Sequence, residues 1–398
     1  MCRSREFDVL VTHGWGRIAY NIVRSLGRRG LKVVLGTDEF QGMAVLSRYT
    51  AANFRHPVFV RHTEEFLATL KQYLKRYTPS VYIPSEQEVL LVAHAREQFN
   101  GLETRFPIAP FVTLCLLHKK DTLAQLAASL DIPSPETIVP RNLQDIIQFA
   151  REFGDPVVLK RKCSSAARGV FYVTQAQMVS PNGASAIHTL PFGEFLVQRY
   201  VRGTGYGVSM LFNHGKLRAK FTHKRLRERI SSGGVSTLRM SVQNTLLEEY
   251  AEKILREVDF HGVAMVEFKY DEKLKRAWLL EVNPRFWGSL ALAIHSGVDF
   301  PYLLYKMAVE GDVEPVMNYK TNVYARWIMG DLLARIQAIS HNGYSSAAPT
   351  PPPSARVFDD FEWRDPLPFA GQFAFSAWKF FRTLGSRPEE ADVLPDRL

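Results

Sequence analysis

The sequence has 398 residues, of which 46% are hydrophobic and 23% charged, and a formal net charge of +10. This length exceeds that of one ordinary core, so we expect two or three domains. The basic residues are spread along the chain and do not alternate with aromatic residues on one element, which argues against a nucleic-acid-binding protein. Charged residues at the start, three cysteines and no run of eighteen apolar residues predict a cytoplasmic protein without signal peptide, disulfide framework or transmembrane segment.

The first 115 residues alternate between strand-like and helix-like patterns. Such alternation is typical of a parallel, doubly wound sheet. The sequence therefore predicts a Rossmann-like α/β domain at this end of the chain. The expected elements are strands at 7–12, 31–35 and 80–84 and helices at 17–29 and 63–77.

A glycine motif follows the first expected strand. Gly14-Trp-Gly16-Arg-Ile-Ala19 is close to the dinucleotide-binding fingerprint, and Asp38 follows the next strand. One interpretation is an NAD-dependent oxidoreductase. The other is a short turn that closes a strand onto its helix, and the motif alone does not decide between them.

Two lysines lie at the ends of expected elements, and the second of them is suited to phosphate binding. Lys120 begins an Ala/Leu-rich helix that ends at prolines, and for this residue alone a solvated lysine at a helix start is the better interpretation. Lys160 ends an apolar strand and is followed by a loop of small residues that contains Ser165 and Gly169. A strand that delivers an ammonium group to such a loop can enclose phosphates with backbone N–H groups.

The next segments are an apolar strand with a glycine-rich bend and a basic strand. Gln198, Tyr200 and Val201 lie where the first strand enters its bend. Arg225 belongs to the basic strand, which leads into Ser-Ser-Gly-Gly and is suited to binding a carboxylate or phosphate. An exposed basic strand is an equally good interpretation of this second segment.

Two apolar runs joined by a charged turn at 271–276 predict a β-hairpin. Side chains alternate along a strand, so Glu281 and Asn283 share one face, and a turn centred near Leu274 places Glu267 opposite Glu281. Buried carboxylates that lie together need a cation, and oxygen ligands of this kind suit Mg²⁺. Arg285 follows two residues later and is placed to bind an anion.

These motifs resemble the ATP-grasp superfamily, especially its carboxylate–amine ligase branch, over about residues 1–330. The resemblance rests on Glu267 and on the Glu281-Val-Asn283-Pro-Arg285 run. It implies that Glu267, Glu281 and Asn283 bind Mg²⁺, and that Arg285 with Arg225 stabilises an acyl phosphate. The remaining ATP ligands that it implies are Lys120, Lys160, Ser165, Gly169, Gln198, Tyr200 and Val201.

The implied fold is a Rossmann-like domain at 1–115, a two-lobed ATP-grasp domain with a small lobe at 116–195 and a large lobe at 196–330, and a C-terminal extension at 331–398. Residues 347–354 are rich in proline and predict an extended linker, and the aromatic stretch after it predicts packing or a homodimer contact. We expect an ATP-dependent ligase that joins a small carboxylate to an amine, with ATP and two Mg²⁺ ions, for which Mn²⁺ is a substitute. The alternatives are the NAD-dependent oxidoreductase, a non-catalytic nucleotide-binding protein, and carboxylation of an amine through carboxyphosphate.

Overall fold

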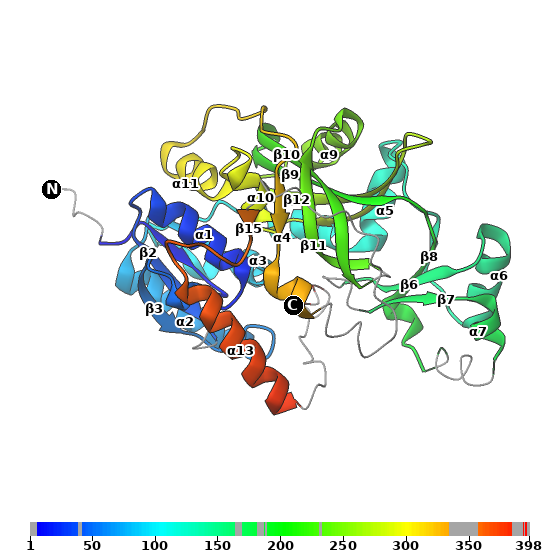
Figure 1. The fold of residues 1–398 in the computed structure, drawn as a ribbon, viewed down its shortest axis with the longest axis horizontal. Coiled ribbons are helices and arrows are strands. Elements are labelled where there is room, and N and C mark those ends of the chain that lie inside the picture. The colour runs from blue at the N-terminus through cyan, green and yellow to red at the C-terminus, as the bar shows by residue number, and fades with distance from the viewer. Residues whose placement is uncertain are drawn as a thin grey trace.

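The computed structural model describes residues 6–38, 42–163, 169–180, 187, 189–230, 233–333, 357–383, 393 and 395. Ser165 and the proline-rich segment 347–354 lie outside these residues. Three sheets form the described part of the chain: a parallel sheet, a central antiparallel sheet and a small sheet at the opposite end (Figure 1).

The N-terminal sheet has four parallel strands in the order β3-β2-β1-β4. Strands β1, β2 and β4 are buried throughout, because helices cover both faces of a parallel sheet. The elements predicted here are confirmed to within a few residues, but strand β3 was not predicted because its side chains are mostly half-buried or exposed. The bounds are β1 (Val9–Val11), α1 (Arg17–Arg28), β2 (Val33–Thr37), η1 (Ala44–Leu46), β3 (Thr50–Arg55), α2 (Thr63–Tyr77), β4 (Val81–Ile83), α3 (Glu88–His94) and η2 (Arg96–Phe99).

The small sheet has four antiparallel strands in the order β5-β8-β6-β7. The apolar strand expected to end at Lys160 is confirmed as β6, which continues to Arg161. Helix α6 presents Ile146 and Phe149 to a core that it shares with Val157 and Val197 of the sheet. The bounds are β5 (Thr137–Ile138), α6 (Leu143–Phe153), β6 (Val157–Arg161), β7 (Val170–Val173), α7 (Gln175–Val179), η3 (Phe192–Glu194) and β8 (Phe195–Arg199).

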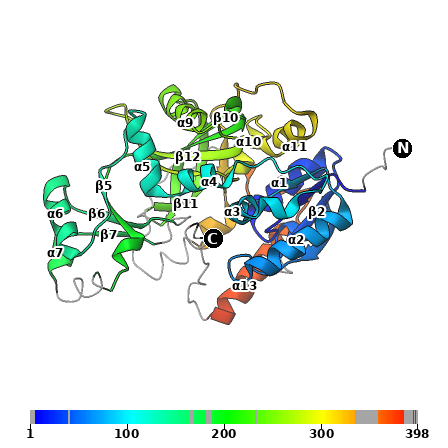
Figure 2. The same ribbon diagram turned by 180° about the vertical axis from the view of Figure 1, so that it is seen from behind.

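The central sheet has the strand order β13-β12-β9-β10-β11-β14-β15. One face packs with helices α4, α5 and α9, which Figure 2 shows in front of the central sheet. Helices α4 and α5 contact β13. The other face packs with α10 and α11, which also contact α1 of the parallel domain. The bounds are α4 (Phe111–His118), α5 (Lys120–Ser129), β9 (Thr204–Asn213), β10 (Lys216–Ile230), β11 (Gly233–Val242), α9 (Thr245–Glu257), β12 (Gly262–Asp271), β13 (Arg276–Asn283), α10 (Leu290–His295), α11 (Phe300–Glu310), β14 (Tyr324–Arg326) and β15 (Val357–Phe358).

The C-terminal segment returns to both larger sheets. Strand β15 pairs in parallel with β14, and helix α13 (Leu367–Thr383) lies beside η1 of the parallel domain. Phe375 of α13 is buried with its ring 6.2 Å from that of Trp15, whereas Phe373 is 55% exposed, so the aromatic stretch packs in part. Within the described ranges, none of the helices combines the length and apolarity needed to cross a membrane.

Candidate functional site

The register of the β12–β13 hairpin brings the two predicted carboxylates together. Glu267 pairs with Glu281, as predicted, while Phe268 pairs with Leu279. A bulge at Leu280 separates these two pairs. Without this extra residue, the register set by the turn would place Glu267 opposite Leu280, and Glu281 would move out of line. The bulge therefore aligns the carboxylates.

The amide of Asn283 lies between the two carboxylates. Its Nδ2 donates to Glu267 Oε1 and to Glu281 Oε1, both at 3.3 Å. Glu267 and Asn283 are 9% and 8% exposed. The predicted convergence of these three side chains on one sheet face is confirmed.

Two glycines of β9 make room on this face for side chains of β10. A Cβ at Gly207 would stand 2.4 Å from Cε1 of His223, and one at Gly205 would stand 2.9 Å from Cδ of Arg225. Gly207 pairs with Glu267 on one side and with His223 on the other. The missing side chains therefore let the β10 residues lie across the sheet toward Glu267.

His223 was not predicted from the sequence. It is 1% exposed, and burial holds its pKa well below the usual value. Its Nε2 lies 3.4 Å from the hydroxyl of Ser289. The available signal was its place two residues before Arg225, which puts both side chains on one face of the strand.

Three cations compensate the carboxylates. Arg225 forms a close ion pair with Glu267. Lys120 Nζ lies 3.8 Å from Glu281 Oε2. Lys160 Nζ donates to Gln198 Oε1 at 2.6 Å, which explains why Gln198 turns its side chain inward.

The electrostatics of the site follow from burial and from these pairs. Burial raises the pKa of Glu267 to about 7, against the opposing effect of Arg225. Burial also acts to raise the pKa of Glu281, but the ammonium groups of Lys120 and Lys160 prevail and lower it. Burial lowers the pKa of Lys160 to about 8. The site therefore contains cationic side chains that can bind an anion and carboxylates that can bind a cation.

Arg285 joins this cluster to the parallel domain. Its Nη2 donates to Asn283 Oδ1 at 3.2 Å, and its Nη1 donates to the carbonyl of Phe286 at 2.8 Å. Glu86 Oε2 lies 3.1 Å from the same Nη1. Glu86 was not predicted, although its place just beyond the carboxyl end of a parallel strand was a usable signal.

The remaining predicted ATP ligands lie around the small sheet. Tyr200 and Val201 occupy the link from β8 to β9, where Tyr200 is 41% exposed and its ring lies 5.8 Å from that of Tyr172. Gly169 has φ +66° and accepts a hydrogen bond from the backbone of Arg161, so it closes the predicted phosphate loop. Ser165 belongs to that loop but lies outside the described residues.

The glycine turn at the parallel sheet is used for packing. A Cβ at Gly14 would meet Cγ of Leu35 at 2.6 Å, and the backbone of Met43 and Ala44 bonds to the carbonyls of Trp15 and Gly14. These contacts account for the first glycine without a dinucleotide. The turn therefore favours the structural interpretation over the oxidoreductase.

The basic strand is largely neutralised within the chain. Lys220, Lys224 and Arg227 form ion pairs with acidic side chains of neighbouring elements. Arg225 alone of the four pairs with the predicted metal ligands. Of these four residues, Arg225 is therefore the one that remains a candidate for binding an anion beside the metal ligands.

The donor set fits Mg²⁺ and a nucleotide. Within the described ranges, no three His, Cys, Asp or Glu residues are grouped so as to hold a metal, so the site offers two carboxylates and an amide. Mg²⁺ is commonly bound by one or two carboxylates together with phosphate oxygens. The amide N–H₂ of Asn283 stands between the carboxylates. Rotation of the amide by 180° would turn its oxygen toward them and would release Arg285 Nη2, which donates to that oxygen.

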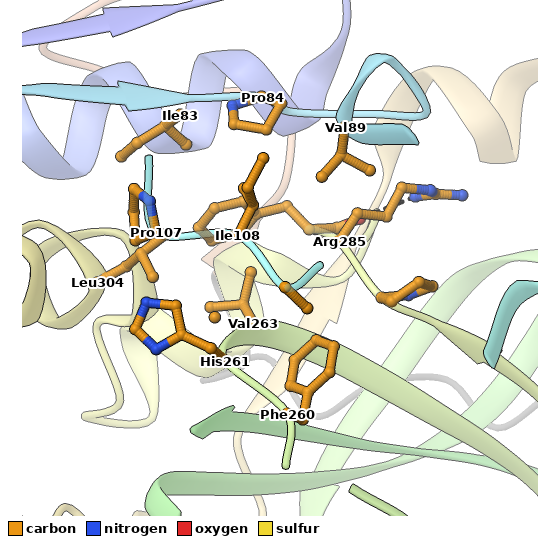
Figure 3. Close-up of a pocket in the computed structure, with 14 residues that line it drawn as sticks. Ile83, Pro84, Val89, Pro107, Ile108, Phe260, His261, Val263, Arg285 and Leu304 are labelled. Carbon is orange, nitrogen blue, oxygen red and sulfur yellow. Dashed lines mark hydrogen bonds between the residues drawn. The ribbon is translucent and has the colours of Figure 1, made fainter. Parts of the chain in front are cut away.

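A small apolar pocket lies between the parallel domain and the central sheet (Figure 3). Ile83, Pro84 and Val89 line it from the parallel domain, and Val263 lines it from β12. The aliphatic part of Arg285 forms one wall. The predicted anion-binding residue therefore stands on the seam between the two parts of the molecule.

Known sequences match parts of this chain, including the part that carries the carboxylates. Residues 191–330 match a family model described as an ATP-grasp in the biosynthetic pathway with the Ter operon. The chain is 24% identical over 181 residues to the carbamoyl phosphate synthase large chain, C-terminal section, of Methanopyrus kandleri, over 42% of this chain. It matches only 33% of that protein, and 20% of the corresponding large chain of Clostridium acetobutylicum.

Solved structures share the fold over most of the chain. Biotin carboxylase from Campylobacter jejuni superposes with a TM-score of 0.65 at 18% identity, over 80% of this chain and 75% of that one. N5-carboxyaminoimidazole synthetase from Staphylococcus aureus, in complex with ADP, gives a TM-score of 0.62 at 16% identity over 80% and 81% of the chains. L-amino acid ligase from Bacillus licheniformis gives 0.60 at 14% identity over 78% and 76%.

Proposed function

We propose that this chain, an ATP-grasp protein, is an ATP-dependent ligase that joins a carboxylate to an amine and releases ADP and phosphate. One observation carries the proposal: Glu267, Glu281 and Asn283 converge on one sheet face, with cations from three other elements around them. The family match and the shared fold support it. We also propose that the reaction forms a C–N bond and that the substrates are a small carboxylate and an amine.

The nucleotide would lie between the small and central sheets. Lys120 and Lys160 would bind its phosphates, and the backbone at Tyr200 and Val201 would contact the adenine. The loop that carries Ser165 and ends at Gly169 would cover the terminal phosphate. Glu267, Glu281 and Asn283 would hold Mg²⁺, for which we propose two ions with Mn²⁺ as a substitute; when bound, the metal supplies charge neutralisation at the phosphates.

The chemistry needs positioning and charge compensation more than a protein nucleophile. A carboxylate oxygen of the substrate attacks the γ-phosphorus, the bond to the β-phosphate oxygen breaks, and ADP leaves. The amine then attacks the acyl carbon, the C–O bond breaks, and phosphate leaves while the nitrogen loses a proton. Arg285 and Arg225 stabilise the negative charge of the acyl phosphate between these two steps.

A second candidate is carboxylation of an amine with bicarbonate as the acid. The fold shared with a biotin carboxylase and an N5-carboxyaminoimidazole synthetase favours it. The same residues would serve, since bicarbonate takes the place of the organic carboxylate. Dependence of ADP release on bicarbonate distinguishes this candidate from the first.

An ADP-release screen tests the proposal. The protein is incubated with Mg·ATP and pooled amino acids and carboxylates, with and without bicarbonate, beside the Glu281→Gln variant. We expect release that depends on one acid and one amine and that falls at least a hundredfold in the variant. Full activity in the variant would contradict the assignment of the metal ligands, and no release with any pair would favour the non-catalytic nucleotide-binding protein.

A further inference from the structure

One ion pair connects the parallel domain to the predicted phosphoryl-transfer site. Glu86 follows β4, and its Oε2 lies 3.1 Å from Arg285 Nη1. The side chains of Glu86 and Arg285 are 26% and 10% exposed. Among the described residues, Glu86 is the only acid that forms an ion pair with this arginine.

A buried network holds Glu86 in place. The backbone N–H of Glu86 donates to Glu88 Oε2 at 2.9 Å, and the N–H of Ser85 donates to Glu88 Oε1 at 2.8 Å. The hydroxyl of Thr12, just beyond β1, also donates to Glu88 Oε1 at 2.8 Å. Ser85 in turn donates from its hydroxyl to the carbonyl of Thr12 at 2.8 Å. The ends of β1 and β4 are thus tied together beneath Glu86.

Arg285, the other member of the ion pair, is also held by hydrogen bonds. Arg285 donates to Asn283 and to its own neighbour Phe286, so its guanidinium bridges the hairpin and the parallel domain. Apart from His261, the other residues that line the pocket are apolar, and apolar contacts set no direction (Figure 3). A charge-assisted hydrogen bond does set a direction.

We propose that Glu86 is a positioning residue, which holds the guanidinium of Arg285 beside the Glu267–Glu281–Asn283 cluster through the Glu86–Arg285 ion pair, and so couples the parallel domain to phosphoryl transfer. This inference rests on the proposed function, because it assigns Arg285 to the transferred phosphate. It adds a determinant from outside the ATP-grasp lobes. Because Glu86 acts through Arg285, its removal should have no further effect once Arg285 is gone.

The test compares Glu86→Ala, Glu86→Asp, Arg285→Ala and the double variant Glu86→Ala/Arg285→Ala. Glu64→Ala, an exposed glutamate on α2, is the matched control. Two readouts are taken: kcat and KM for each substrate found in the screen, and the ratio of Mg·ATP to Mg·ADP affinity by calorimetry. The second readout needs no turnover, so it tests the inference even when the ligase proposal fails.

We expect Glu86→Ala to lower kcat about tenfold, with the KM for ATP within twofold, and to lower Mg·ATP but not Mg·ADP affinity severalfold. Aspartate should restore part of the loss, and the double variant should match Arg285→Ala, as expected for residues that act as a unit. Wild-type values in Glu86→Ala beside a loss in Arg285→Ala would overturn the inference, as would additive losses in the double variant. No change in either single variant would also overturn it, while leaving the metal cluster to be judged by Glu281→Gln.

Discussion

Glu88 in the parallel domain and Glu281 in the central sheet are both carboxylates in poorly solvated positions, yet their pKa values move in opposite directions. Glu88 is fully buried and accepts hydrogen bonds from a hydroxyl and two backbone N–H groups, and burial raises its pKa to about 7. Burial acts the same way on Glu281, but Lys120 and Lys160 lower its pKa. In the parallel domain, therefore, the carboxylate fixes the backbone through hydrogen bonds, whereas in the central sheet the carboxylate stays charged and is available to a cation.

The glycines of the two regions differ in the same way. Gly14 makes room for Leu35, which belongs to the core of its own domain. Gly207 makes room for His223 beside the candidate site. The glycine of the parallel domain therefore allows an apolar core to pack closely, whereas the glycine of the central sheet allows a polar side chain to lie beside the candidate site.

The largest expected effect concerns the compensated carboxylate. Replacing Arg225 by Met should lower the free energy of unfolding by up to about 3–5 kcal/mol, because the buried Glu267, whose pKa is already raised to about 7, would lose its partner and would have to take up a proton or stay charged without compensation. Denaturant unfolding measures this loss. Arg225→Met/Glu267→Gln should recover most of it, and a double variant as unstable as the single one would show that the pair is not electrostatically coupled.

The parallel domain should respond to pH through Glu88. Its folded pKa, about 7, lies above the usual value of 4.5, so the stability linked to its protonated form is complete below about pH 4.5 and is lost as pH rises through 7. Relative to Glu88→Gln, the wild type should therefore lose roughly 3 kcal/mol of unfolding free energy between pH 4.5 and pH 8. Denaturant unfolding across this range checks it, and a constant difference between the two proteins would contradict the account.

The smallest expected effect concerns Gly207, the glycine that makes room for His223. Gly207→Ala places a methyl group 2.4 Å from the ring of His223 and should cost about 1–3 kcal/mol of stability, together with weaker nucleotide binding. Gly16→Ala is the matched control, because a Cβ there would meet nothing within 4 Å. Thermal unfolding of both variants checks the contrast. Equal losses would show that the space beside Gly207 is not required by His223.

Local patterns explain how much the sequence could predict. The β12–β13 hairpin was predictable because two apolar runs flank a charged turn, and the parallel sheet was predictable from its alternating elements. The bulge at Leu280 left no such pattern, although it aligns Glu267 with Glu281. Glu86 and His223 were not predicted because their neighbours in space, Arg285 and Gly207, lie on other elements.

The most direct test of the central claim is the Mg²⁺ dependence of ATP binding. Calorimetric titration with ATP, with and without Mg²⁺, compares the wild type with Glu267→Gln/Glu281→Gln, in which both carboxylates keep their shape and lose their charge. We predict that Mg²⁺ strengthens binding to the wild type at least tenfold and has less than a twofold effect on the variant. An equal Mg²⁺ effect on both proteins would contradict the assignment of the metal site to these carboxylates.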